Sequence, residues 1–300
     1  MKMNNEEYTI GIIGGTGIYD FNQIDDAQWV DIESPFGSPS DSILIGFINE
    51  QRIAFLPRHG RGHILSPSEI NYRANIDVLK RSGVTKILSF SAVGSLRKEI
   101  EPGTFVVVDQ YIDRTFKREN TFFSDGFVAH VSMANPVCND LSKLVERIGK
   151  KNKINIIRGG TYIVIEGPQF STLSESKFYQ SMGCDIIGMT NMPEAKLARE
   201  AEISYCSIAM TTDYDCWHPK HENVSTKNIL DILSENSNNA QSLIQNCIKE
   251  LRNDNTICSD GCNRSLDNAI CTDIKYRKKN TFNKIYNIAG RVINKDGWIK

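Results

Sequence analysis

The sequence lacks a long apolar run, and it lacks a strong excess of charge of either sign. No uninterrupted apolar stretch is long enough to span a bilayer, and residues 1–7 contain no apolar signal core. The 35 Lys and Arg side chains balance 36 Asp and Glu side chains, so the formal net charge is -1. Such a chain has no overall positive field to gather nucleic acid or an anionic membrane. We therefore expect a soluble, cytoplasmic protein that acts on small molecules.

The cysteines follow no familiar metal-binding spacing. Cys184 and Cys206 lie in apolar stretches typical of buried, reduced thiols. Cys258 and Cys262 flank a short polar segment, with Cys271 further on, which leaves a local disulfide or a metal clip open. Because this spacing matches no zinc signature, we expect structural thiols and no metal site.

Short apolar runs alternate with amphipathic stretches along most of the chain. The runs are nearly continuous in Ile, Val and Leu, which suits strands buried on both faces. We expect strands over residues 8–13, 42–48, 52–56, 86–91, 105–112, 161–165, 185–189 and 204–210. We expect helices over residues 68–81, 173–182, 194–201 and 226–251, the last with Ser and Asn residues that could break it. The pattern predicts an α/β fold in which helices cover a sheet.

The composition changes after Arg252. Residues 253–300 are rich in Asn, Asp and Lys and include a basic run over residues 275–279, which is typical of a solvated face. Apolar residues between 285 and 293 recur at helical spacing. We therefore expect a main domain over residues 1–252 and a C-terminal extension over residues 253–300, partly helical, that packs on the core or is flexible.

Glycines and cations follow two of the expected strands but form no standard nucleotide motif. Gly14–Gly17 lacks the third glycine of a dinucleotide fingerprint and the Gly-Lys-Ser/Thr of a P-loop. Its amides and the Thr16 hydroxyl suit an anion, although a turn without a ligand explains this motif equally well. Arg58, His59 and His63 add further donors for an anion, and an arginine fork can pair with phosphate through two hydrogen bonds. A solvated basic loop is the alternative for this segment.

Two carboxylates, Asp213 and Asp215, follow an apolar strand and precede a large aromatic residue. One carboxylate there could cap a helix, but two suit the exocyclic amine and ring nitrogen of an adenine-like base. Small residues over 89–95 and the segment 189–191 end two further strands, and Phe170 on a Gly-Pro turn could stack on a base. Because several strand ends offer the same kind of donor, the sequence predicts a purine site.

Together these segments closely resemble the S-methyl-5′-thioadenosine phosphorylases of the purine nucleoside phosphorylase superfamily. The resemblance runs in order through residues 14–17, 34–37, 58–60, 71–75, 93–96, 109–110, 112–115, 165–168, 189–190 and 212–217. It implies a three-layer α/β/α fold with a central mixed β-sheet. It also implies phosphorolysis of methylthioadenosine to adenine and 5-methylthioribose 1-phosphate, in methionine and purine salvage. A homotrimer or a dimer of trimers is implied, with no cofactor and with inorganic phosphate as co-substrate.

The resemblance assigns roles to the matching positions of this sequence. Phosphate would be bound by Thr16, Arg58, His59, Ser91, the Ala92 amide and Thr190. Met189 would lie against the ribose and Phe170 against the base, while Asp213 and Asp215 would contact adenine and act in catalysis. The further candidates for substrate binding are His63, His130, Thr226 and Leu230. Of these, His130 matches a residue that the family lends to the 5′ pocket of the neighbouring subunit.

The acidic pair also bears on mechanism and specificity. As the glycosidic bond lengthens, adenine gains negative charge, so a proton shared between Asp213 and N7 would stabilise the leaving base. Related 6-oxopurine phosphorylases carry Asn where Asp213 stands, and a carboxylate accepts a 6-amino group but rejects a 6-oxo oxygen. Thr226 stands where an apolar residue is common, which leaves adenosine open as a second substrate. The alternatives are a purine nucleoside or methylthioinosine phosphorylase and a catalytically silent nucleoside-binding homologue.

Overall fold

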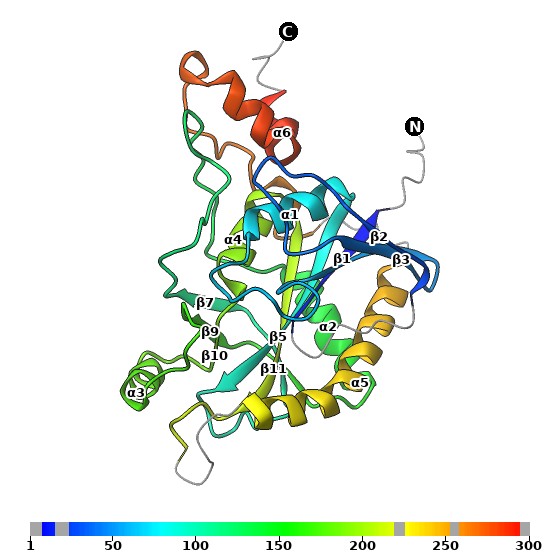
Figure 1. Cartoon of the computed structure of the whole chain (residues 1–300), viewed down its shortest axis with the longest axis vertical. Helices are drawn as coiled ribbons and strands as arrows, with labels where there is room; N and C mark the ends of the chain where they lie inside the picture. Colours follow the sequence, from blue (N-terminus) through cyan, green and yellow to red (C-terminus); the bar gives the residue numbers. More distant parts are fainter. Residues whose placement is uncertain (1–7, 16–23, 219–225, 253–257, 295–300) are drawn as a thin grey trace.

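The computed structural model describes residues 8–15, 24–218, 226–252 and 258–294. An eleven-stranded sheet lies at the centre, with helices on both faces (Figure 1). The strands are β1 (Thr9–Gly14), β2 (Asp25–Val30), β3 (Ile43–Ile48), β4 (Gln51–Pro57), β5 (Val84–Ser95), β6 (Phe105–Val107), β7 (Gln110–Asp113), β8 (Ile156–Arg158), β9 (Thr161–Val164), β10 (Ile186–Gly188) and β11 (Ser204–Asp213). The helices are α1 (Tyr72–Arg81), α2 (Asn139–Lys151), α3 (Leu173–Ser181), α4 (Asn191–Glu200), α5 (Thr226–Leu251) and α6 (Lys279–Ile293), with short 3-10 turns η1 (Cys262–Arg264) and η2 (Ile274–Tyr276).

The sheet is mixed, and β5 lies at its branching point. This strand pairs in parallel with β1 and with β11, and its last residues pair antiparallel with β10. The sheet continues from β1 through β4, β3 and β2, from β10 through β9 and β7, and from β11 through β6 and β8. Because β4, β1, β5 and β11 are mutually parallel, their carboxyl ends meet at one edge of the sheet.

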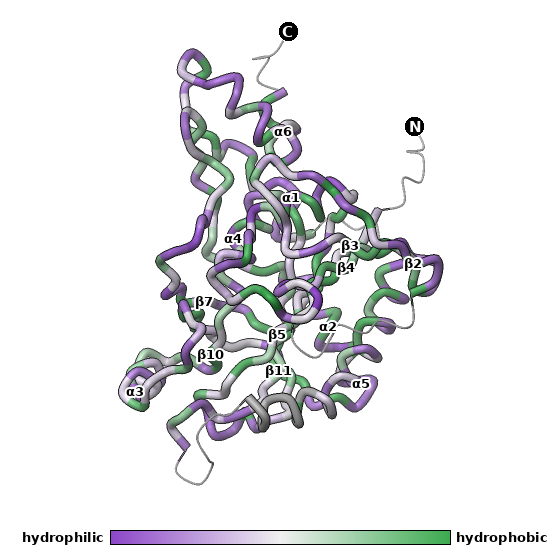
Figure 2. The backbone as a smooth tube through the Cα atoms, viewed as in Figure 1, coloured by the Kyte–Doolittle hydropathy of each residue, from purple (hydrophilic) through white to green (hydrophobic). Residues whose placement is uncertain are grey.

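The central strands contribute alternate side chains to two hydrophobic cores. Ile87 of β5 and Tyr205 of β11 belong to the core that is completed by α1, α4 and α6. Their sequence neighbours Leu88 and Cys206 belong to the opposite core, completed by α2 and α5. A strand buried on both faces needs apolar residues at nearly every position, as the sequence shows. The predicted three-layer α/β/α fold with a mixed sheet is confirmed, and Figure 2 shows hydrophobic segments lining its centre.

Several local predictions differ from the structure. The run 105–112, expected as one strand, forms β6 and β7, which pair with different neighbours. Strand β2 was not predicted because its residues are mostly exposed and lack an apolar alternation; β8 and α2 were also missed. Helix α5 is unbroken, since polar residues near its middle such as Ser234, Asn238 and Asn239 lie on its exposed face.

The described part of the C-terminal extension packs on the main domain. Helix α6 contacts α1 and buries Phe282, Ile285 and Ile288 in the same core as α1 and α4. Before α6 in the extension, Ile270 forms an isolated β-bridge with Ala129. Within the described residues, none of the helices has the length and apolar content needed to cross a membrane.

Candidate active site

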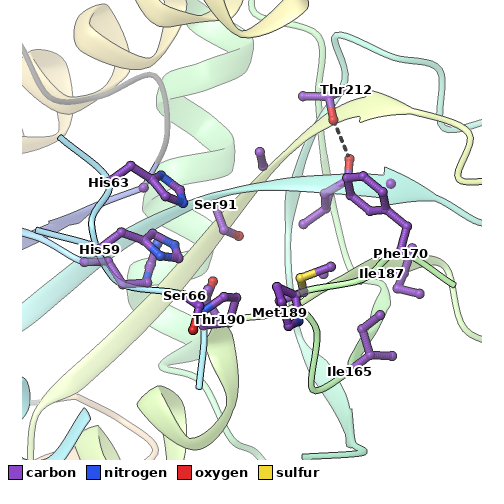
Figure 3. Close-up of a pocket in the computed structure, with 18 of the residues that line it drawn as sticks. His59, His63, Ser66, Ser91, Ile165, Phe170, Ile187, Met189, Thr190 and Thr212 are labelled. Carbon is purple, nitrogen blue, oxygen red and sulfur yellow. Dashed lines mark hydrogen bonds between the residues drawn. The ribbon is translucent and has the colours of Figure 1, made fainter. Parts of the chain in front are cut away.

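A cavity of about 720 Å³ lies where the carboxyl ends of β1, β4, β5 and β11 meet. Most of the predicted site residues line it: Arg58, His59, His63, Ser91, Ala92, Phe170, Met189, Thr190, Asp213 and Asp215. In Figure 3 the histidines and Ser91 lie on one side of the cavity, and Phe170 and Thr212 lie on the other. The cavity therefore has two chemically different ends.

Four of the predicted residues are not placed in this cavity. Thr16 lies outside the described residues. Thr226 and Leu230 lie in the first turns of α5, and their side chains are outside what the structure describes. His130 is exposed and does not line the cavity, and its backbone N–H donates to Ala269 O at 2.9 Å. A role for His130 in the pocket of a neighbouring subunit stays a prediction.

A β-bulge at the end of β11 brings Asp213 to the cavity wall. The pairing of β11 with β5 shifts register between Thr211 and Asp213, so Asp213 lies opposite Gly94. Bulges re-aim side chains in this way and often occur beside active sites. A Cβ atom at Gly94 would lie 2.9 Å from Asp213 Oδ1, so glycine is needed there to leave room for the carboxylate.

The environment of Asp213 and Asp215 raises the pKa of both carboxyl groups. Asp213 Oδ2 accepts a hydrogen bond from Thr212 Oγ1 at 2.7 Å, and Oδ1 accepts one from the Asp215 N–H at 2.7 Å. Burial nevertheless raises the pKa of Asp213, and the charge of Asp215 raises it further. Burial also raises the pKa of Asp215. Carboxyl groups with raised pKa values can hold and transfer a proton nearer to neutral pH than ordinary aspartates.

At the other end, Arg58 is fully buried and is paired with Glu194 of α4. Its Nε donates to Glu194 Oε2 at 2.8 Å, and its Nη2 donates to Oε1 at 3.0 Å. Nη1 donates to Phe90 O, and Nη2 donates to Ser89 Oγ, both at 2.7 Å. A guanidinium has five N–H groups, so these bonds leave one on Nη1. The pair of guanidinium hydrogen bonds that was expected to bind phosphate is therefore made to Glu194.

His59 and Ser91 offer further groups at this end. His59 Nδ1 donates to Leu65 O at 2.8 Å, and the imidazole stacks on His63 with centroids 4.1 Å apart. Burial and the charge of Arg58 lower the pKa of His59 to about 4, so the ring is neutral at pH 7 and Nε2 can accept a hydrogen bond. The buried Ser91 hydroxyl has no partner at normal hydrogen-bond distance within the described residues. Such a mixture of donors and one acceptor suits a phosphate that still carries a proton.

Glu194 was not predicted as a site residue. Besides Arg58, its Oε1 accepts hydrogen bonds from Ser89 Oγ at 2.6 Å and from Tyr205 Oη at 2.7 Å. The only signal in the sequence is an acidic residue among the apolar residues of a predicted helix, where Ala195 and Leu197 are buried. Such a residue is more often solvent-exposed, so its role could not be read from that pattern.

Arg118 was missed as well, and it fixes the backbone beside the cavity. Its Nη1 donates to Met189 O at 2.6 Å and to Met192 O at 2.7 Å, and its Nη2 donates to Glu166 O at 2.8 Å. An ion pair with the Glu166 carboxylate, at 3.3 Å, holds the guanidinium in place. Arg118 lies in an irregular segment without periodicity, so no sequence pattern indicates its partners.

Comparison with known proteins agrees with this geometry. Residues 9–249 match the family described as Phosphorylase superfamily. The S-methyl-5′-thioadenosine phosphorylase of Rhodospirillum rubrum is 55% identical over 284 residues, which cover 95% of this chain and 97% of the relative. The chain belongs to the S-methyl-5′-thioadenosine phosphorylase family of this superfamily. The resemblance inferred from the ordered motifs is thereby confirmed.

Solved structures of S-methyl-5′-thioadenosine phosphorylases share the fold. A methylthioadenosine phosphorylase from an antarctic soil metagenomic library has a TM-score of 0.88 and 43% identity, over 94% of this chain and 99% of that one. The methylthioadenosine phosphorylase of Schistosoma mansoni in complex with adenine has a TM-score of 0.79 and 36% identity, over 82% and 92%. A variant of the Schistosoma enzyme, named there an adenosine/methylthioadenosine phosphorylase, was solved with methylthioadenosine, with a TM-score of 0.77, 37% identity and the same coverage.

Proposed function

We propose that this chain catalyses the phosphorolysis of S-methyl-5′-thioadenosine to adenine and 5-methylthioribose 1-phosphate. The observation that carries the proposal is that the two ends of one cavity carry different chemical groups. Groups suited to phosphate lie at one end, and a pair of carboxyl groups with raised pKa values lies at the other, beside Phe170. The family membership of the chain supports the same reaction.

The reaction would proceed by attack of phosphate on C1′ from the side opposite to the base. Phosphate would lie among Arg58, His59 and Ser91, where its oxygen forms the new bond to C1′ as the bond to N9 breaks. The electron pair of the broken bond passes to the base, and Asp213 donates its proton to N7. This negative charge develops in the transition state and is absent from the ground state. Stabilising it therefore lowers the activation barrier. Inorganic phosphate is the co-substrate in these steps, and they need no cofactor.

Specificity for the base would come from the two carboxyl groups. Asp215 would accept from the 6-amino group, which a 6-oxopurine lacks, while Asp213 addresses N7. The 5′ substituent is less constrained, because Thr226 stands where an apolar residue is common in the family. We therefore propose adenosine as a secondary substrate, a breadth that the name of the Schistosoma relative carries for that protein.

We further propose that the chain assembles as a trimer or a dimer of trimers. Phe116, Leu173 and Phe178 are large apolar side chains that are 76%, 48% and 55% exposed in the single chain. Exposed apolar side chains of this size are common at subunit interfaces. A cytoplasmic location and a role in methionine and purine salvage stay predictions from the sequence.

A product assay tests the proposed reaction. Purified protein is incubated with phosphate and either methylthioadenosine, adenosine or methylthioinosine, with a phosphate-free control, and the released base is identified by chromatography. We expect phosphate-dependent release of adenine, fastest from methylthioadenosine. Release of hypoxanthine alone would favour the methylthioinosine or purine nucleoside alternative. Binding of a nucleoside without release of any base would favour a catalytically silent homologue.

A further inference from the structure

Three cysteines from distant parts of the chain meet outside the cavity. Cys138 Sγ lies 3.3 Å from Cys258 Sγ, which in turn lies 3.1 Å from Cys262 Sγ. The three sulfur atoms all lie within 4.8 Å of one another, and all three cysteines are free thiols. None of them lines the cavity. The sequence indicated the proximity of Cys258 and Cys262 but not of Cys138, because Cys138 precedes Cys258 by 120 residues.

The backbone on both sides holds the thiols together. Cys138 is the N-cap residue of α2, and it contributes no side-chain hydrogen bond to the cap. On the other side, Gly261 adopts a left-handed conformation with φ 67°, and its N–H donates to Cys258 O at 3.0 Å. This turn brings Cys262 back beside Cys258. Asp260 Oδ2 accepts from the Asn139 N–H at 3.1 Å, which ties the turn to the start of α2.

A buried arginine next to the cluster needs a negative partner. Arg199 is 7% exposed, and its Nη1 lies 3.5 Å from Cys262 Sγ. Its Nη2 donates to the backbone oxygen of Asn135. In the part of the chain that the structure describes, no ion pair joins Arg199 to a carboxylate. Since an uncompensated buried charge is strongly unfavourable, thiolates are the groups placed to balance it.

We propose that Cys138, Cys258 and Cys262 bind a thiophilic cation, Zn²⁺, as three thiolates. Thiolate sulfur is a preferred ligand of zinc, and a Zn–S bond of about 2.3 Å places tetrahedral sulfur atoms about 3.8 Å apart. The two sulfur separations of 3.3 and 3.1 Å have to widen by about 0.5 and 0.7 Å, which small side-chain rotations allow. A water molecule fills the fourth position from the side of Cys258, which is only partly buried.

The charges of the site balance on binding. Each thiol loses its proton to solvent as it ligates the metal, so the site forms more readily as the pH rises. Three thiolates and one Zn²⁺ carry a net charge of about -1, which the guanidinium of Arg199 neutralises. Because Cys138 caps α2 while Cys258 and Cys262 belong to the C-terminal extension, the metal links the extension to the main domain. The site is structural and takes no part in the reaction in the cavity.

Titration of reduced, chelator-treated protein with Co²⁺ tests the proposal, since thiolate–cobalt charge-transfer absorption reports sulfur ligation directly. We expect one Co²⁺ per chain with this absorption, displaced by Zn²⁺, and a higher thermal unfolding midpoint with Zn²⁺. The variant Cys258→Ser should lose the absorption and bind Zn²⁺ at least about 100-fold more weakly. Loss of a residue that only hydrogen-bonds to a metal ligand already weakens metal binding about 10–100-fold. The matched control is Cys271→Ser, because Cys271 is exposed and lies outside the cluster.

The outcomes separate cleanly. No thiolate absorption in the wild-type protein overturns the proposal, as does equal absorption in Cys258→Ser. A disulfide between two of the three cysteines that survives treatment with a reductant and Zn²⁺, seen by mass spectrometry, also overturns it. Nucleoside phosphorolysis in Cys258→Ser shows that the variant is folded, since Cys258 lies outside the cavity. The assay of phosphorolysis and the assay of metal binding therefore test the two proposals independently.

Discussion

Removing the charge of Glu194 should destabilise the protein by about 3–5 kcal/mol, because it leaves the charge of Arg58 buried without a partner. The two side chains are only 1% and 3% exposed. Glu194 accepts two hydrogen bonds from Arg58 and one each from Ser89 and Tyr205. In Glu194→Gln the new amide nitrogen can only donate, so at least one of these donors loses its acceptor.

The same substitution should weaken phosphate binding. Glu194 holds the guanidinium of Arg58 at the cavity wall, where Nη1 lies beside Gly15. Loss of one hydrogen bond to a charged group is worth about 1.5–3 kcal/mol, so the KM for phosphate should rise about 10–100-fold. Urea unfolding measures the stability, and initial rates at varied phosphate give the KM.

A double-mutant cycle isolates the pair itself. We expect Arg58→Met and Glu194→Leu each to destabilise strongly and the double variant to lose clearly less than their sum, with a coupling of at least about 2 kcal/mol. The matched control is the surface pair Arg147 and Glu250, which are 60% and 32% exposed, with the same substitutions and a coupling below about 1 kcal/mol. If the losses at Arg58 and Glu194 simply add, within about 0.5 kcal/mol, the reasoning about the buried pair is refuted.

Other predictions concern the base, the histidine and the extension. Asp213→Asn should lower kcat for methylthioadenosine about 10²–10⁴-fold, whereas Asp26→Asn, on exposed strand β2, should match wild type; an active Asp213→Asn enzyme would remove the assigned role. Because burial lowers the pKa of His59 to about 4, unfolded chains bind a proton at this residue below about pH 6.5 that folded chains do not. Stability should therefore fall by about 3 kcal/mol between pH 6.5 and 4 in urea titrations, and His59→Gln should flatten this dependence. Ile288→Ala in α6 should cost about 2–5 kcal/mol and exposed Asn283→Ala less than about 0.5, and equal effects in urea unfolding would contradict the packing of α6.

Much of the fold could be predicted because burial on both faces leaves a strong trace in sequence. Strands β1, β5 and β11 contribute to two cores, so their apolar residues are nearly continuous. An exposed edge strand such as β2 leaves no such trace. The division of 105–112 into β6 and β7 follows from pairing with different strands, which local patterns cannot show.

The site residues that follow strand ends could be predicted from the sequence. Those that hold other residues in place through hydrogen bonds and ion pairs could not. Asp213 and His59 were identified from loop chemistry, and both line the cavity. Glu194 and Arg118 act through partners that are 136 and 71 residues away, Arg58 and the Met189 backbone. Such pairs are fixed by tertiary packing, and an isolated charged residue in the sequence does not reveal its partner.

Strand β5 fixes the distance between two parts of the cavity wall. Ser91 and Gly94 of this strand both line the cavity, and Gly94 lies opposite Asp213. Since a strand rises about 3.3 Å per residue, these positions are about 10 Å apart, and hydrogen bonds to the neighbouring strands prevent stretching. The spacing between Ser91 and Gly94 in the cavity wall is thus fixed by the strand. Inserting one residue between them would lengthen this span and also turn every later side chain to the opposite face.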